Sequence, residues 1–186
     1  MHSLRVFFAI TPPKLIQPLL VKTLASLRKA FPEQALKWMQ PENLHITLQF
    51  IGNIPQIQIT ELIHQVQLAF KNTSALPLQL GQLEWFPSLE QRKLLSLTVE
   101  PQDLLRMLSS TLRQILIDLN LGPETLPFRG HMTLGRIVQP SLCLKRLETQ
   151  TIPSIPEVLI DTIHLLESRS DNSGSNYHPL AEFKLT

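Results

Sequence analysis

Two copies of one tetrapeptide are the part of this sequence best suited to chemistry. The chain reads His-Ile-Thr-Leu at 45–48 and His-Met-Thr-Leu at 131–134, and each copy follows a turn and opens an expected strand. Side chains alternate between the two faces of a strand, so the His and the Thr of each copy share one face. If the two halves of the chain pack together, two imidazoles and two hydroxyls converge on one cleft.

Paired histidines suit displacement at phosphorus. The ordinary pKa of imidazole, about 6.5, lets one copy accept a proton while the other donates one near neutral pH. His45 and His131 are therefore candidates for an acid and base pair, and the hydroxyls of Thr47 and Thr133 for hydrogen bonds to the non-bridging oxygens. The sequence contains no His-Glu-x-x-His, no Cys-x-x-Cys and no carboxylate adjoining either copy. We therefore expect neither a metal nor a cofactor.

Each of these residues also has a structural interpretation. A lone His in an apolar strand is most often structural, and Thr is a good strand former. The repetition of the pattern favours the functional interpretation. Phe8 and Phe50 belong either to the core or to a base-stacking edge of the cleft. His64, in the middle of an expected helix, is interpreted as a surface residue without a role.

Length and composition indicate one compact domain over residues 1–186, because 186 residues that are 43% hydrophobic bury one sizeable core. The formal net charge of +2 is too small for an extended basic arm on nucleic acid, but it allows a local anion site. A single cysteine, Cys143, cannot close an intrachain disulfide, so a cytoplasmic location is expected. The apolar run 6–10 is too short for a signal sequence, and no stretch approaches the roughly 20 apolar residues of a membrane span.

The hydrophobic pattern alternates between strand and helix periods. Strands are expected over 6–10, 44–51, 76–86, 93–99, 131–138, 158–166 and 181–185. Helices are expected from the prolines at 12–13 to 30, where Pro18 kinks or delays the first turn, and over 57–70, 101–121 and 141–147. A polar loop at 168–176 separates the last two strands. This order excludes an all-α bundle and favours an antiparallel-rich α+β fold.

Four stretches that include both motifs resemble a known family. They are Arg-Val-Phe-Phe-Ala-Ile at 5–10, the segment 41–52, the segment 128–136, and the tail from 167 to 185. Together they resemble the two-histidine phosphoesterase superfamily, and they are most similar to its bacterial and archaeal RNA 2',3'-cyclic phosphodiesterase branch, also called 2'-5' RNA ligase. The resemblance extends from one end of the chain to the other.

The resemblance implies a bilobal, pseudo-twofold α+β fold, with two antiparallel-rich sheets around a central cleft and helices outside. It also implies metal-independent opening of a 2',3'-cyclic phosphate to a 2'-phosphate. His45 would then be the proton donor to the leaving O3', and His131 the proton acceptor for water. Phosphate binding would fall to Thr47, Thr133 and Arg136.

Three functions remain open at the level of sequence. The first is hydrolysis of 2',3'-cyclic phosphate ends of RNA or nucleotides by a monomer. The second is a 2'-5' RNA ligase that joins such an end to a 5'-hydroxyl, which uses the same two histidines in reverse but must hold a 5' end against competing water. The third is a non-catalytic RNA-end-binding module. It is favoured by one departure, because relatives commonly have Pro before the second His where this chain has Gly130, and glycine loosens that turn.

Overall fold

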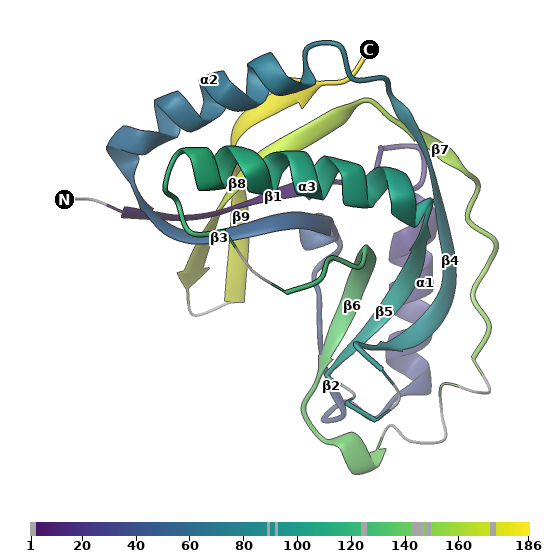
Figure 1. The fold of residues 1–186 in the computed structure, drawn as a ribbon. Coiled ribbons are helices and arrows are strands. Elements are labelled where there is room, and N and C mark those ends of the chain that lie inside the picture. Colours follow the sequence, from purple (N-terminus) through teal and green to yellow (C-terminus); the bar gives the residue numbers. More distant parts are fainter. Residues whose placement is uncertain are drawn as a thin grey trace.

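A curved antiparallel sheet forms the frame of the molecule, and helices cover its outside (Figure 1). In this computed structural model the described residues are 3–88, 90–91, 93–123, 126–142, 147, 150–171 and 174–186. The elements are β1 (Ser3–Ile10), α1 (Gln17–Ala30), β2 (Leu36–Trp38), β3 (Ile46–Pro55), α2 (Ile59–Phe70), β4 (Leu76–Phe86), β5 (Leu94–Glu100), α3 (Gln102–Asp118), β6 (His131–Ile137), β7 (Val158–Ile160), β8 (Thr162–Asp171) and β9 (Gly174–Lys184). Short 3-10 turns lie at Pro41–Asn43, Gln56–Gln58 and Pro140–Leu142.

The sheet consists of two halves joined along one line. Its strand order is β7-β4-β5-β6-β3-β1-β8-β9, with β2 paired to β6. Within each half the strands pair over several residues, whereas β3 and β6 share a single register pair, Ile46 with Met132. We call this junction the seam. The α+β class is confirmed, and the two expected sheets are one nine-stranded antiparallel sheet that the seam divides.

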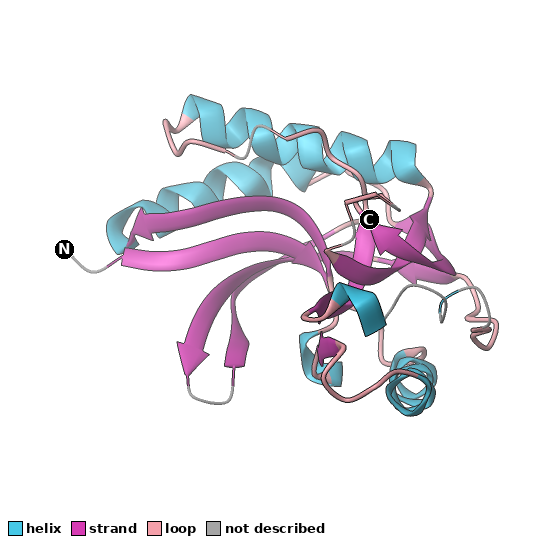
Figure 2. Cartoon of the chain, turned by 90° about the horizontal axis from the view of Figure 1, so that it is seen from below, coloured by secondary structure: helices cyan, strands magenta, loops and turns pink. Residues whose placement is uncertain are grey.

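The helices bury apolar stripes against the outer face of this sheet. Leu105, Leu108, Leu112 and Leu116 recur along α3 at helical spacing and are buried. Figure 2 shows α2 and α3 together over one side of the sheet. α1 begins at Gln17 with proline in its first turn, as expected from a delayed start. No described helix is long and apolar enough to span a membrane.

Two expectations about the tail are wrong. The segment 168–176 is not a loop: β8 continues to Asp171 and β9 begins at Gly174, and the two strands form a projecting ribbon (Figure 1). Exposed polar side chains line its end, so the apolar pattern ends before the strands do. The expected strand 158–166 is split, because β7 pairs with β4 whereas β8 pairs with β1. Of the expected helix 141–147, residues 143–146, Cys143 included, lie outside the described residues.

The strand that carries the first motif is longer than expected. We predicted its end at 51, before Gly52, but β3 continues to Pro55. Gly52 has a φ of +89° and lies beside a register shift in the pairing of β1 with β3. Glycine tolerates this conformation, so the residue interpreted as a stop signal is part of a bulge within the strand.

Candidate active site

The seam brings the two motifs together. Ile46 and Met132 form its register pair, and both side chains are fully buried in the core. Extending this antiparallel register by one residue each way aligns the His of each motif with the Thr of the other. Because the paired residues point into the core, their neighbours point to the opposite face. The two motifs therefore present both imidazoles and both hydroxyls on one surface.

Two hollows on this surface share Thr47 as a wall. The first, the His45 hollow, has a volume of about 170 Å³ and is lined by His45 together with Arg5, Phe50, Arg136 and Tyr177, among others. The second, the His131 hollow, has a volume of about 160 Å³. Its lining includes His131, Gln49, Phe86, Phe128 and Arg129. A group bound at Thr47 can therefore contact both hollows.

His45 is held by a backbone hydrogen bond and by two aromatic rings. Its Nδ1 lies 2.6 Å from the carbonyl oxygen of Asn43, at the end of the turn Pro41–Asn43. A carbonyl only accepts, so Nδ1 carries the proton and Nε2 is left for chemistry. The imidazole centroid is 5.1 Å from the Phe7 ring and 5.0 Å from the Tyr177 ring. The Asn43 amide in turn donates to the carbonyl oxygen of Ser175, at 2.7 Å.

His131 has the same tautomer but different neighbours. Its Nδ1 donates to the carbonyl oxygen of Arg129, at 3.0 Å, which again leaves Nε2 for chemistry. The imidazole stacks on Phe86, with centroids 3.7 Å apart and planes inclined by 20°. The Arg129 guanidinium lies over the same Phe86 ring and pairs with Glu84, at 2.8 Å.

Gly130, which precedes the second His, is held rather than loose. The Gln102 side chain donates from Nε2 to the Gly130 carbonyl, at 2.8 Å, and accepts at Oε1 from the Gly130 N–H, at 2.9 Å. A Cβ at this position would stand 2.9 Å from Cδ1 of Leu105. Glycine therefore lets the chain approach α3 closely enough for the Gln102 amide to bind its backbone. The looseness expected from the sequence is absent for this reason.

Burial dominates the electrostatics of both histidines. Desolvation lowers the pKa of His45 below its ordinary 6.5, against the raising effect of the bond to Asn43, and the charges of His131 and Arg136 lower it further. Desolvation also lowers the pKa of His131, partly offset by its bond to Arg129. The two imidazoles are therefore mainly neutral at pH 7 while no anion is bound, and a bound phosphate favours protonation.

A bulge directs Arg136 into the His45 hollow. Strict alternation from Thr133 would place a side chain three residues later on the opposite face. The pairing of β6 with β5 shifts between Thr133 and Gly135, which leaves Leu134 as an extra residue. This extra residue reverses the alternation, so Arg136 lies on the motif face and lines the hollow.

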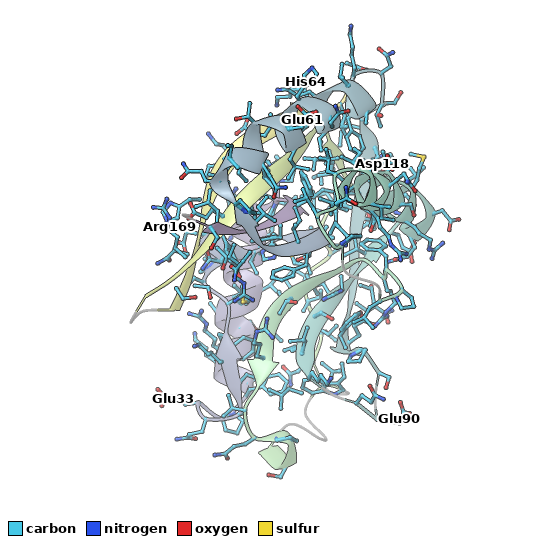
Figure 3. All side chains as sticks on the ribbon, turned by 60° about the vertical axis from the view of Figure 1, so that its left-hand side comes forward. Glu33, Glu61, His64, Glu90, Asp118 and Arg169 are labelled. Carbon is cyan, nitrogen blue, oxygen red and sulfur yellow. The ribbon has the colours of Figure 1, made fainter. Side chains whose placement is uncertain are left out.

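The five predicted site residues are distributed over the seam. His45, Thr47 and Arg136 line the His45 hollow, and His131 lines the other hollow with Thr47. Thr133 lines neither hollow and is half-buried on β6 beside the seam. His64 is exposed on the outer side of α2 (Figure 3), as interpreted from the sequence.

Sequence reasoning missed several residues that shape the site. Arg5 lines the His45 hollow, and its place in the stretch 5–10 that resembles the family was a usable signal. Gln102 had no signal, since its partner Gly130 is distant in sequence. Of the two candidate stacking residues, Phe8 is fully buried in the core, whereas Phe50 lines the hollow. Within the described ranges, no group of three or more His, Cys, Asp or Glu could hold a metal.

Comparisons with known proteins match one described family and several named relatives. The family described as LigT like Phosphoesterase matches residues 10–94. The RNA 2',3'-cyclic phosphodiesterase of Aeropyrum pernix is 28% identical over 172 residues, which cover 89% of this chain and 96% of that protein. The protein of the same name from Aquifex aeolicus is 26% identical over 153 residues, covering 80% and 81% of the two chains.

Solved structures share the whole fold. TT0787 of Thermus thermophilus superposes with a TM-score of 0.79 at 22% identity, covering 97% of each chain. LigT of E. coli complexed with 3'-AMP gives a TM-score of 0.78 at 24% identity, covering 100% of this chain and 99% of that one. The fold and the paired motifs resemble those of two-histidine phosphoesterases. The chain is similar to the LigT-like phosphoesterases over residues 10–94 and to named RNA 2',3'-cyclic phosphodiesterases over most of its length.

Proposed function

We propose that the protein hydrolyses 2',3'-cyclic phosphate ends of RNA or nucleotides to 2'-phosphates. The observation that carries the proposal is the meeting of the two His-x-Thr motifs at the seam, with both Nδ1 atoms bound to backbone carbonyls. Two relatives named RNA 2',3'-cyclic phosphodiesterase support this substrate, and the complex of E. coli LigT with 3'-AMP supports a nucleotide ligand.

The mechanism places the phosphorus beside Thr47, between the two hollows. Neutral His131 accepts a proton at Nε2 from a water molecule, whose oxygen attacks phosphorus as the bond to O3' breaks. Protonated His45 donates from its Nε2 to O3', so the product keeps its phosphate on O2'. Thr47, Thr133 and Arg136 stabilise the non-bridging oxygens, whose charge increases in the transition state.

The proposal treats residues 1–186 as a single two-lobed domain that acts as a monomer, because every group in the mechanism comes from one chain. The proton transfers are assigned to the two imidazoles, without a metal or a cofactor. The balance between the two proton states then sets the pH dependence.

A ligase reaction is supported by one feature, the size of the His131 hollow. Its volume of about 160 Å³ exceeds the roughly 30 Å³ that one water occupies in the liquid. A 5'-terminal nucleoside bound there, against Phe86 and Phe128, would present its 5'-hydroxyl in place of water. Ligation is therefore the second candidate function.

The test is turnover with product analysis. A nucleoside 2',3'-cyclic phosphate and an oligoribonucleotide with a cyclic phosphate end are incubated with the protein and EDTA, and 2'-phosphate is resolved from 3'-phosphate. Hydrolysis predicts 2'-phosphate from both substrates and a bell-shaped pH profile. A 5'-hydroxyl oligonucleotide in a parallel sample detects ligation as a longer product. Saturable binding without product would contradict both reactions and leave a binding module.

A further inference from the structure

We infer that Arg5, together with Arg136, binds a second phosphate of the substrate, namely the phosphate on the 5' oxygen of the terminal nucleoside. The enzyme would then prefer RNA ends, or nucleotides that carry a 5'-phosphate, over nucleoside cyclic phosphates. This inference rests on the proposed function and specifies its substrate.

The first observation is that two cations from distant strands line one small hollow. Arg5 lies on β1 and Arg136 on β6, in opposite halves of the sheet, and both line the His45 hollow. Burial raises the pKa of the Tyr177 phenol, whereas the charges of Arg136 and Arg5 both lower it. Both guanidinium groups are thus close enough to act on one hydroxyl group.

The second observation is that the described part of the chain provides no counter-charge for this pair. None of the residues that line the His45 hollow is Asp or Glu. Among described residues, neither Arg5 nor Arg136 forms an ion pair, whereas Arg129 of the other hollow pairs with Glu84. Arg169, on the outer ribbon in Figure 3, likewise pairs with Glu167. Unopposed guanidinium groups in a shared concavity favour an anionic ligand.

The in-line geometry of the proposed reaction identifies the anion that the two arginines bind. In-line displacement places the entering water and the leaving O3' on opposite sides of phosphorus. Water is activated by His131, so O3' and the ribose attached to it lie on the side of His45. The His45 hollow therefore receives the terminal nucleoside rather than the attacking group. Beyond the ribose, the nearest anionic group of an RNA end is the phosphate on its 5' oxygen.

The two arginines then lie beside different phosphates of the substrate. Arg136 affects the pKa of His45 and so lies on the side of the reacting phosphate. Arg5 has its guanidinium carbon 5.2 Å from the centroid of the Phe50 ring, which orients the side chain along the hollow wall. This leaves Arg5 as the principal ligand of the 5'-phosphate.

The experiment compares a nucleoside 2',3'-cyclic phosphate with the same compound carrying a 5'-phosphate. For the wild-type protein we expect the 5'-phosphate to raise kcat/KM by about tenfold or more, as a charge-assisted contact provides. In Arg5→Gln this ratio of kcat/KM values falls toward one, and in Arg5→Lys it stays between the two. Arg106→Gln is the matched control, since Arg106 is exposed on α3 and pairs with Asp103, and it keeps the wild-type ratio.

A wild-type ratio near one, or an unchanged ratio in Arg5→Gln, would overturn the inference. If the Arg5 variants do not fold, the wild-type ratio is measured at increasing ionic strength, where it must decrease because salt screens the added phosphate. If neither compound is turned over, the proposed function itself fails. The ratio of their dissociation constants, measured by calorimetry, still tests the phosphate site in that case.

Discussion

His45 and His131, the two histidines proposed as acid and base, occupy equivalent positions in repeated motifs but are supported by different surroundings. Both donate from Nδ1 to the carbonyl of the residue two positions earlier. His45 forms a cluster of three rings with Phe7 and Tyr177, whereas His131 stacks on Phe86. The repetition thus fixes the proton-transfer atoms, while each half of the molecule supplies its own support.

The backbone before each histidine shows the same contrast. Asn43 ends a 3-10 turn and binds β9 through its side chain, so the approach to His45 is held by local structure and the ribbon. The approach to His131 is held by Gln102, the first residue of α3, through two hydrogen bonds to Gly130. Loss of the Gln102 side chain should therefore displace His131, the proposed base, more than His45, the proposed acid.

The largest effect is expected when either imidazole is removed. His45→Ala and His131→Ala should each reduce kcat/KM at least about a hundredfold, because a positioned acid or base contributes that much. The double variant should lose little more than either single variant, since the two groups act in one step. Steady-state kinetics on a cyclic nucleotide measure this. His64→Ala, an exposed histidine on α2, is the control, and a single variant at full rate would refute the assignment.

The next-largest effect tests whether Gln102 positions His131. Gln102→Met keeps the length of the side chain but removes both hydrogen bonds to Gly130 and a third to the Val99 carbonyl, which costs about 1–3 kcal/mol for polar groups left unpaired. We expect kcat to fall about tenfold with little change in KM, because His131 loses its position rather than a substrate contact. Gln114→Met, on the exposed side of the same helix and bonded to Asp118, is the matched control. Equal kinetics in the two variants would contradict a positioning role.

A smaller effect is expected in the pH dependence of kcat/KM, which distinguishes the two histidines. The proposed mechanism needs His45 protonated and His131 neutral, and burial lowers both pKa values below 6.5. We therefore expect kcat/KM for a small cyclic nucleotide to be maximal below pH 6.5 and to fall above it. Arg136→Gln removes a charge that lowers the pKa of His45, so the alkaline limb should move to higher pH. An alkaline limb that does not move in Arg136→Gln would show that a group other than His45 determines it.

The smallest effect concerns stability. A lowered folded-state pKa means that the unfolded chain binds more protons near pH 6, so the free energy of unfolding should decrease as pH falls through 6.5. His45→Ala removes one such group and should flatten this dependence. Urea denaturation at a series of pH values measures it, and an identical slope in the variant would contradict the burial of a neutral imidazole.

The face that the first-motif residues share was predictable because it depends on local alternation. The faces of His45 and Thr47 follow from the period of a strand, and the structure places both on the motif face. The side of Arg136 was not predictable in this way, because the extra residue Leu134 reverses the alternation and leaves no mark in the hydrophobic pattern. Gln102 was missed because its role depends on a contact between positions 102 and 130.

The fold was predictable where strands are buried. β4 lies over the expected residues 76–86, since each of its ends coincides with a change in apolar pattern. The β8–β9 ribbon was missed because its far end is polar and exposed, so backbone pairing rather than burial defines it. That two expected sheets form one sheet depends on a single pair at the seam, which no pattern in the sequence specifies.

The seam also leaves one spacing in the site without the support of a backbone ladder. Hydrogen-bonded ladders stiffen each half, but the spacing between proton donor and acceptor crosses a junction with one register pair and the packing of Ile46 on Met132. One continuous apolar core that includes residues of both halves, rather than backbone pairing, therefore holds this spacing.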